Sequence, residues 1–501
     1  MKRMLAAVAL VWTTTLGPHA QVPSVRPLLL VIVVDGLRPD YVTPQLMPRL
    51  SALGRRGMTF SAHHAVYPPV TRVNVSTMVT GVYPERHGLL GNTIFIPSVN
   101  AARGLDTGSY ANLEAVARAE GRLLASPSLG EMLQPLGKKL VAIGSGTSGA
   151  AFLLNHTVAG GAIIHQEFTR PESLGPHVLE KLGPLPKSDM PNAALNRRVV
   201  DAFFGLAIDE LRPDLTFLWL SDPDHTAHDK GVGTEVTRRA LQLVDGEIGR
   251  VEDGLRARKL LERTDILVTS DHGFSTHGGT YRLESIIEPF VKTAADGTRD
   301  VVVSEGAIYV RAADRESRAA AIVAALQKRP EAGAIFTRPR SDGGPEGVVA
   351  GTLSFDVVHW NHPRSGDILV SANWSRSPNA DGFAGQTSDR GVAGHGASSP
   401  YDMHNVLIVA GPDFRERATS DAATGSIDLA PTLLRLLAVP VPKTLTGRVI
   451  EEAFAGGVTP AGERDSTSVR SADGAYELTA HVSIAAGHRY LDYTDVVRRN
   501  P

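Results

Sequence analysis

Leu28-Leu29-Leu30-Val31-Ile32-Val33-Val34-Asp35-Gly36 is the stretch that decides the fold. An unbroken run of Leu, Val and Ile is typical of a strand that is buried on both faces. The run ends directly in Asp35, so a carboxylate stands at the carboxyl end of the predicted strand. The sequence therefore predicts a buried strand with a candidate functional group at its end.

Similar apolar runs recur along the chain, at residues 139–143, 215–220, 266–269 and 406–410. Helical patterns lie between them, and the clearest spaces apolar residues by three and four at Leu241, Val244, Ile248, Val251 and Leu255. Residues 426–437 are expected to return to the core as a helix. Strands that alternate with helices predict an α/β fold, with a mostly parallel sheet covered by helices on both faces.

The alternation loosens between residues 280 and 391, where stretches such as 338–345 are rich in Gly and Pro. We interpret this region as an inserted cap subdomain. The predicted division is a signal peptide at 1–20, a core formed by 27–279 and 392–455, the insert at 280–391, and a C-terminal appendage at 456–501.

The composition is that of an ordinary globular protein, with 501 residues, of which 42% are hydrophobic and 21% charged. The net charge is −2 and no long run of one sign occurs, so nucleic acid is not expected as a stable partner. The chain contains no cysteine, which excludes disulfides and zinc–thiolate sites. Any metal must therefore be held by histidines and carboxylates. Separately, we expect the chain to be a monomer or a homodimer.

The N-terminus has the pattern of a secretory signal, with Lys2 and Arg3, an apolar stretch from 4 to about 16, and a cleavage point after Ala20. A membrane anchor is the alternative, but the stretch is shorter than the ~20 residues that span a bilayer. The expected location is periplasmic or secreted, with no membrane span once the signal is removed.

Acidic residues follow three of the predicted strands, namely Asp35, then Asp222 and Asp224, then Asp271. In open α/β sheets ligands bind outside the carboxyl ends of the strands, so these acids are expected to converge on one crevice.

Three short motifs add histidines to these acids. His228 stands four residues after Asp224, which would place both on one face of a helix. His272 follows Asp271 directly, and His395 lies between two glycines. Each motif alone fits an ordinary surface, helix-capping or loop residue equally well.

Together the motifs supply three carboxylates and three imidazoles, at Asp35, Asp224, His228, Asp271, His272 and His395. This donor set suits zinc better than magnesium or calcium, and its size fits two ions. Two ions about 3.5–4 Å apart can activate an attacking oxygen and stabilise a leaving oxygen in phosphoryl transfer.

Thr71 is the candidate nucleophile. Pro68-Pro69 sets up a helix start, which places the Thr71 hydroxyl at the positive end of that helix. The alternative is that Thr71 is only an N-cap residue.

The order of the motifs resembles the nucleotide pyrophosphatase/phosphodiesterase branch of the alkaline phosphatase superfamily. The matching elements are V-V-D-G at 33–36, P-x-x-T at 68–71, Y-P-E-R-H-G-L-L-G-N at 83–92, D-x-x-x-H at 224–228, S-D-H-G at 270–273 and G-H-G at 394–396. The resemblance covers most of 27–279 and 394–454, and implies an alkaline phosphatase-like three-layer α/β/α sandwich.

The resemblance also implies roles for individual residues. One zinc would be bound by Asp224, His228 and His395, and the other by Asp35, Thr71, Asp271 and His272. Asn92 would hold a nonbridging phosphate oxygen, whereas Asn74 is expected to be a buried helix-packing residue. The implied reaction has two steps: Thr71 attacks phosphorus, and the resulting covalent threonine ester is then hydrolysed at the zinc centre.

Departures from the family pattern bear on the substrate. Arg72 and Val73 replace an aromatic residue and proline, so Arg72 could meet a second phosphate or be solvated. Trp219 could form an aromatic wall of the site or be a core residue. Monoesterases of the superfamily carry a Lys-x-Arg pair in a segment comparable to 145–149, which here has no charge. A diester substrate is therefore favoured over a monoester, and the sulfatase motif is absent.

The prediction is thus a small-molecule phosphodiesterase with two zinc ions. The alternatives are a phosphomonoesterase or phosphonate hydrolase on the same site, and a noncatalytic metal-dependent binding protein.

Overall fold

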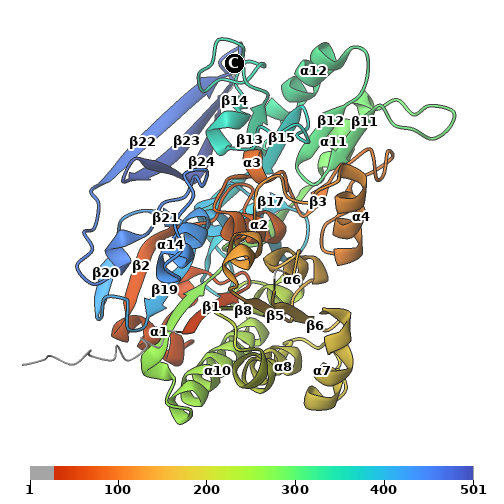
Figure 1. Ribbon diagram of the computed structural model, residues 1–501. Coiled ribbons are helices and arrows are strands. Elements are labelled where there is room, and N and C mark those ends of the chain that lie inside the picture. Colours follow the sequence, from red (N-terminus) through yellow and green to blue (C-terminus); the bar gives the residue numbers. More distant parts are fainter. Residues whose placement is uncertain (1–27, 159, 500–501) are drawn as a thin grey trace, which may run out of the picture.

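The computed structural model of the chain describes residues 28–158 and 160–499 (Figure 1). The predicted signal peptide at 1–20 lies outside the described residues. Within the described ranges, no helix combines the length and the apolar character needed to cross a membrane.

A ten-stranded sheet forms the centre of the described part of the chain. Its order is β20 (Ala418–Ser420), β2 (Met58–His64), β19 (His404–Ala410), β9 (Thr264–Thr269), β1 (Leu28–Val34), β8 (Leu215–Leu220), β5 (Leu140–Gly144), β6 (Ala162–His165) and β7 (Thr169–Arg170), with β21 (Thr424–Gly425) beside β2. β1 is parallel to both of its neighbours, and β8, β5 and β6 continue the parallel part. β19 is antiparallel to β9 and β2. The predicted mostly parallel sheet is confirmed.

The two faces of β1 enter two separate hydrophobic cores. Leu29, Val31 and Val33 belong to one core, and the alternate residues Leu30, Ile32 and Val34 to the other. α8 (Ala193–Ala202) and α10 (Glu235–Ala257) cover the second face, and α2 (Thr71–Thr80), α6 (Ser148–Leu154) and α14 (Leu429–Leu436) cover the first (Figure 1). The predicted three-layer α/β/α sandwich is therefore confirmed, as are the helices expected at 241–255 and 426–437.

The remaining helices are short or peripheral. They are α1 (Pro48–Arg56), α3 (Pro84–His87), α4 (Tyr110–Glu120), α5 (Leu129–Leu133), α7 (Gly175–Leu182), α9 (Asp224–Lys230), α11 (Leu283–Ile287), α12 (Arg315–Gln327) and α13 (Pro400–Met403), and β3 (Thr93–Ile94) pairs with β4 (Leu105–Asp106).

Two further sheets involve the region predicted as an insert. One contains β11 (Val301–Ser304), β12 (Ala307–Val310), β15 (Ile368–Ala372), β13 (Ala332–Thr337) and β14 (Leu353–Ser354), in that order. The other contains β16 (Trp374–Pro378), β17 (Ala384–Asp389), β10 (Ser275–Tyr281) and β18 (Ala393–Gly394). This second sheet joins strands from both sides of the predicted boundaries near 280 and 391, so the domain division stays a prediction.

A three-stranded antiparallel sheet ends the chain, formed by β22 (Gly462–Arg470), β23 (Tyr476–Ala485) and β24 (His488–Arg498). A buried polar network joins this sheet to the core. The guanidinium of Arg448 donates to both carboxylate oxygens of Glu452, at 2.6 and 2.8 Å, and to the hydroxyl of Tyr490 on β24, at 3.1 Å. Tyr490 donates in turn to Asp428, at 2.8 Å.

Arg448→Ala is expected to lower the free energy of unfolding by about 3–5 kcal/mol, because it leaves the fully buried Glu452 carboxylate without its cation. Urea denaturation measures the change. The matched control is Arg470→Ala, whose partner Glu477 lies on the surface hairpin and whose own side chain is 64% exposed. The Arg470→Ala variant should lose roughly 0–1 kcal/mol of its free energy of unfolding. Equal losses in the two variants would contradict the structural role of Arg448.

Candidate functional site

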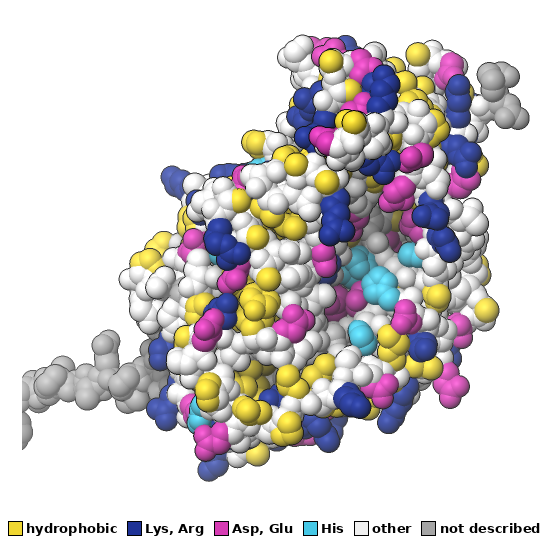
Figure 2. Space-filling model, turned by 90° about the vertical axis from the view of Figure 1, so that its right-hand side faces the viewer, with side chains coloured by type: hydrophobic (Ala, Val, Ile, Leu, Met, Phe, Trp, Pro, Cys, Tyr) yellow, Lys and Arg dark blue, Asp and Glu magenta, His cyan; other side chains and the backbone are white. Residues whose placement is uncertain are grey.

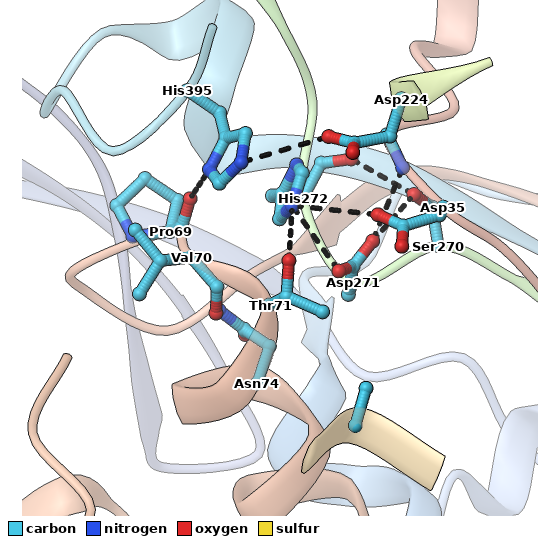
Figure 3. Close-up of polar contacts among 12 residues, drawn as sticks. Asp35, Pro69, Val70, Thr71, Asn74, Asp224, Ser270, Asp271, His272 and His395 are labelled. Atoms are coloured by element: carbon cyan, nitrogen blue, oxygen red, sulfur yellow. Dashed lines mark hydrogen bonds and ion pairs between the residues drawn. The ribbon is translucent and has the colours of Figure 1, made fainter. Parts of the chain in front are cut away.

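The candidate site lies where three neighbouring parallel strands end. Asp35 follows β1, Asp224 begins α9 just after β8, and Asp271 and His272 follow β9 (Figure 3). The backbone N–H of Asp224 donates to the carbonyl of Asp35 at 3.1 Å, and the N–H of Gly36 donates to Asp271 at 3.2 Å. The predicted convergence of these strand-end acids is therefore seen at Asp35, Asp224 and Asp271.

The first cluster of potential ligands contains Asp224, His228 and His395. α9 places Asp224 and His228 one turn apart, as the four-residue spacing predicts, with Nε2 of His228 at 3.2 Å from Oδ1 of Asp224. His395 comes from the loop after β18, and its Nε2 lies 3.6 Å from the same oxygen.

The second cluster contains Asp35, Asp271 and His272. Nε2 of His272 lies 3.1 Å from Oδ2 of Asp271 and 3.7 Å from Oδ1 of Asp35. The hydroxyl of Thr71 lies 3.2 Å from this same Nε2. The rings of His272 and His395 stack with their centroids 3.6 Å apart, which places the two clusters side by side (Figure 3).

The three histidines are anchored in the same way. Nδ1 of His228 lies 3.2 Å from the carbonyl of Ala393, Nδ1 of His272 lies 2.9 Å from that of Gly273, and Nδ1 of His395 lies 3.1 Å from that of Pro69. A carbonyl only accepts, so each Nδ1 must carry the proton. Each Nε2 is then free to offer a lone pair, which is the usual arrangement of histidines that bind metals.

Three carboxylate oxygens at the site are buried and, within the described chain, have no hydrogen-bond partner. They are Oδ1 of Asp35, Oδ1 of Asp224 and Oδ2 of Asp271, the same atoms that lie closest to the histidine Nε2 atoms. Burial and the neighbouring charge of Asp271 raise the pKa of Asp35 well above its ordinary value. Buried acceptors facing imidazole lone pairs fit a pair of bound cations, because a cation is what both kinds of group require.

Thr71 is the first residue of α2, and only 3% of its surface is exposed. Asn74 fixes the turn that leads to it. Its side-chain oxygen accepts from the N–H of Val66 at 2.8 Å, and its amide donates to the carbonyl of Val70 at 3.2 Å. Asn74 is fully buried, which confirms the expectation that it is a packing residue.

Asn92 and Arg72 lie together beside the start of α2. The side-chain oxygen of Asn92 accepts from the N–H of Arg72 at 3.1 Å, which leaves the Asn92 amide nitrogen as a donor for a ligand. The N–H of Asn92 donates to Glu305 at 2.7 Å. Glu305 was not anticipated from the sequence, since it lies within the predicted insert at 280–391, 213 residues further along the chain. Nε of Arg72 is buried and lacks a hydrogen-bond partner among residues 28–158 and 160–499.

Of the two interpretations of Trp219, its surroundings fit the core residue: it is only 1% exposed and donates from Nε1 to Oδ2 of Asp35 at 2.9 Å. The surroundings of Asp222 differ from the sequence expectation. Asp222 does not join either cluster. It accepts from the N–H of Asn192 and from the hydroxyl of Thr226, both at 2.7 Å, because the strand end turns it towards α8 and α9.

A cavity of about 410 Å³ lies beside the clusters. His395 and Gly396 line one end of it, and Tyr281, Glu305 and Tyr309 line the side formed by β10 and the five-stranded sheet. Figure 2 shows histidine and acidic side chains gathered in a hollow of this face of the molecule. The hollow has room for a small molecule next to the candidate ligands.

Sequence comparisons show which known proteins the chain is similar to. Residues 29–386 match the sequence profile of the family described as type I phosphodiesterase / nucleotide pyrophosphatase. A venom phosphodiesterase of Naja atra is 26% identical over 281 residues, 56% of this chain and 29% of that protein. Human ectonucleotide pyrophosphatase/phosphodiesterase family member 1 is 28% identical over 250 residues, 49% of this chain and 23% of that protein. The matches thus span about a quarter of these relatives.

A solved structure has a similar fold. Murine ectonucleotide pyrophosphatase/phosphodiesterase 5, an inactive threonine-to-alanine variant in complex with AMP, superposes with a TM-score of 0.59. The match covers 84% of this chain and 97% of that one, at 18% identity. It supports the α/β fold described above.

Asp35→Asn is expected to stabilise the metal-free chain at pH 7, on the order of 1–3 kcal/mol, because it removes one of three neighbouring buried carboxylates. Between the ordinary pKa of an aspartate and the raised pKa of Asp35, the folded chain binds more protons than the unfolded chain. Stability therefore falls as the pH rises through that window in the parent, and less so in the variant. Chemical denaturation in chelator across pH 4–8 measures both.

The contrasting control is Asp222→Asn. Its carboxylate is already paired with backbone and hydroxyl donors, so an amide would turn one acceptor into a donor that faces another donor. This variant should be less stable than the parent. A metal-free Asp35→Asn variant that is also less stable would show that the three carboxylates do not repel one another.

Proposed function

The chain belongs to the type I phosphodiesterase / nucleotide pyrophosphatase family, and from this membership we propose that it is an exported, zinc-dependent hydrolase of phosphate diesters. The observation that carries the proposal is the position of Thr71. Its hydroxyl stands at the start of α2, 3.2 Å from Nε2 of His272 in the cluster of Asp35, Asp271 and His272.

One zinc ion would be held by Asp224, His228 and His395, and the other by Asp35, Asp271, His272 and the Thr71 oxygen. Imidazole and carboxylate donors without sulfur favour zinc over the harder magnesium and calcium. When bound, the two ions would supply positive charge that lowers the pKa of an attacking oxygen and offsets the charge of the phosphate. The buried carboxylate oxygens of Asp35, Asp224 and Asp271 that have no hydrogen-bond partner within the described chain support this assignment.

The reaction would take place in two displacements at phosphorus. In the first, the Thr71 oxygen forms a bond to phosphorus and loses its proton, and the bond from phosphorus to the leaving alcohol breaks. In the second, water attacks phosphorus, and the Thr71 oxygen leaves and recovers a proton. In a murine relative of similar fold, a variant with threonine replaced by alanine is inactive, which supports a nucleophilic role for Thr71.

The chain's own donors would meet the negative charge on the phosphate. The amide nitrogen of Asn92 is free to donate, because the Asn92 oxygen is fixed by the N–H of Arg72. The N-terminus of α2 adds the favourable end of the helix dipole. These groups are positioned before the substrate arrives, as electrostatic stabilisation of a transition state requires.

A diester is the favoured substrate class because the loop after β5 carries no charge. A side chain at Gly146 would come within 3.1 Å of Trp219 and 3.8 Å of Oδ2 of Asp35, so this loop borders the second cluster. It has no cation that could pair with the second charge of a monoester. Arg72, whose N–H donates to Asn92, is the candidate for a contact with a second phosphate.

Export is part of the proposal and rests on the basic and apolar N-terminal pattern at residues 1–20. Relatives described as venom and ecto-enzymes agree with a protein that acts outside the cytoplasm. The periplasm or the surrounding medium is the proposed location.

Thr71→Ala is expected to lower kcat for bis-p-nitrophenyl phosphate by at least about 10³-fold, because the nucleophile is lost. Thr71→Ser keeps a hydroxyl and should retain activity within about tenfold. The matched control is Thr80→Ala on the same helix, whose hydroxyl donates to the carbonyl of Ser76. Steady-state kinetics on zinc-loaded protein measures all three. Full turnover by Thr71→Ala would exclude a threonine intermediate.

The zinc-loaded chain is expected to prefer diesters, with kcat/KM for bis-p-nitrophenyl phosphate or a p-nitrophenyl ester of thymidine monophosphate exceeding that for p-nitrophenyl phosphate by at least about tenfold. The physical reason is the uncharged loop at Gly146, which provides no ion pair for a dianion. Because one laboratory leaving group serves all three substrates, the comparison isolates the group at phosphorus. A large preference for the monoester would contradict the assignment.

A further inference from the structure

A third group of metal-type side chains lies outside the two clusters described above, where β24 meets the central sheet. It contains His64 on β2, His404 on β19 and Asp492 on β24, and their potential ligand atoms all lie within 4.8 Å of one another. No motif in the sequence marks this group, because its members are brought together only by the fold.

Strand register places the two histidines. β2 and β19 are antiparallel, and His64 and His404 are direct partners in that ladder, so their side chains project on the same face. Their ring centroids are 4.5 Å apart. The neighbouring strands thus present two imidazoles towards β24.

A β-bulge places the carboxylate. In the β23–β24 ladder, His481 pairs with Tyr493 and the next residue, Val482, pairs with Leu491. Asp492 is therefore the extra residue of a bulge. Bulges redirect a side chain and are frequent beside functional sites. Here the bulge directs Asp492 to the two histidines, and the hydroxyl of Ser483 donates to both of its oxygens, at 3.0 and 2.9 Å.

Two features of the clusters recur in this group, namely the anchored Nδ1 of His64 and the unsatisfied Nε2 of His404, although the contact between His64 and Asp492 is shorter. Nδ1 of His64 lies 2.9 Å from the carbonyl of Thr424, which leaves Nε2 to face Oδ1 of Asp492 at 2.8 Å. Nε2 of His404 is buried, lies 3.6 Å from the same oxygen, and finds no hydrogen-bond partner in the described chain. The corresponding separations in the two clusters are between 3.1 and 3.7 Å. Donors around a tetrahedral zinc stand about 3.3 Å apart, given bonds of about 2.0 Å.

We propose that His64, His404 and Asp492 form a structural site for a third divalent cation of the zinc class. Two imidazoles and a carboxylate are a suitable donor set, and Ser483 and the Thr424 carbonyl orient the ligands from behind. The bound ion would tie β24 to β2 and β19. It would stabilise the junction of the C-terminal sheet with the core, since it binds only the folded chain.

A metal-free histidine–aspartate hydrogen bond is the competing interpretation. It accounts for the 2.8 Å contact of His64 with Asp492 but leaves Nε2 of His404 buried and unsatisfied. The C-terminal sheet contains an ordinary histidine–aspartate contact for comparison: Nε2 of His481 on β23 lies 3.1 Å from Oδ2 of Asp495 on β24, and within the described residues no third potential ligand joins this pair. This pair provides a matched control.

Zinc content tests the proposal in a full-length chain in which Asp224→Asn and Asp271→Asn disable the two clusters. Equilibrium dialysis against zinc, followed by elemental analysis, should find one equivalent per chain in this background. Adding His404→Gln should remove that equivalent, and adding His481→Gln should leave it. Zinc should also raise the melting temperature of the background and of the His481→Gln chain, but not that of the His404→Gln chain.

Zero zinc in the background, or an equal loss in the two histidine variants, would overturn the proposal. If His404→Gln does not fold, Asp492→Asn provides a second variant with the same expected loss. A folded background that binds no zinc overturns the proposal whether or not either histidine variant folds, and the loss of the equivalent in His404→Gln or Asp492→Asn assigns the ion to this site. Phosphodiesterase activity is not needed for any of these readouts, so failure of the proposed function would not be mistaken for failure of this site.

Discussion

Three buried carboxylates, Asp35, Asp224 and Asp271, impose the constraint on which the site depends. Burial and the nearby charges of Asp271 and Asp224 disfavour the charged form of Asp35, so the pKa of Asp35 is raised. Two donors offset part of this repulsion, Nε1 of Trp219 towards Asp35 and the N–H of Gly36 towards Asp271. One oxygen of each carboxylate has no hydrogen-bond partner in the described chain and faces a histidine nitrogen. This arrangement suits bound cations.

A stiff scaffold is needed to hold like charges together, and the parallel sheet provides it. β1 is buried on both faces, so neither side of the strand can move to separate Asp35 from its neighbours. The turn after β1 requires Gly36, which has a positive φ of 69°. A side chain there would approach Cβ of Asp224 to 3.0 Å. The hydrophobic packing on both faces of the sheet therefore holds the neighbouring carboxylates together at the carboxyl ends of its strands.

The sheet and its edge could be predicted from the sequence because they depend on local patterns. The apolar run before Asp35, the four-residue spacing of Asp224 and His228, and the Pro-Pro start before Thr71 each specify a local structure that the fold retains. The order of these elements along a parallel sheet then brings the ends together. This is why the six candidate ligands could be chosen from local patterns, whereas their division into two clusters came from the family resemblance.

Other residues could not be assigned from sequence because their surroundings are formed by distant segments. Trp219 and Asp222 belong to the same strand end as Asp224, yet one supports Asp35 and the other turns towards α8. Glu305 reaches the site from the insert, and Asp492 reaches His64 only through a bulge. The spacing of apolar residues in the sequence cannot predict such contacts, since they depend on strand register and on how the sheets pack against one another.

The site therefore has two halves with different origins. The half with potential metal ligands is built from strand ends of the central sheet, and its spacing is fixed by strand pairing. The half that would meet the substrate depends on Asn92, whose backbone is held by Glu305 from the insert. A change in the insert can alter the substrate half without disturbing the strand ends.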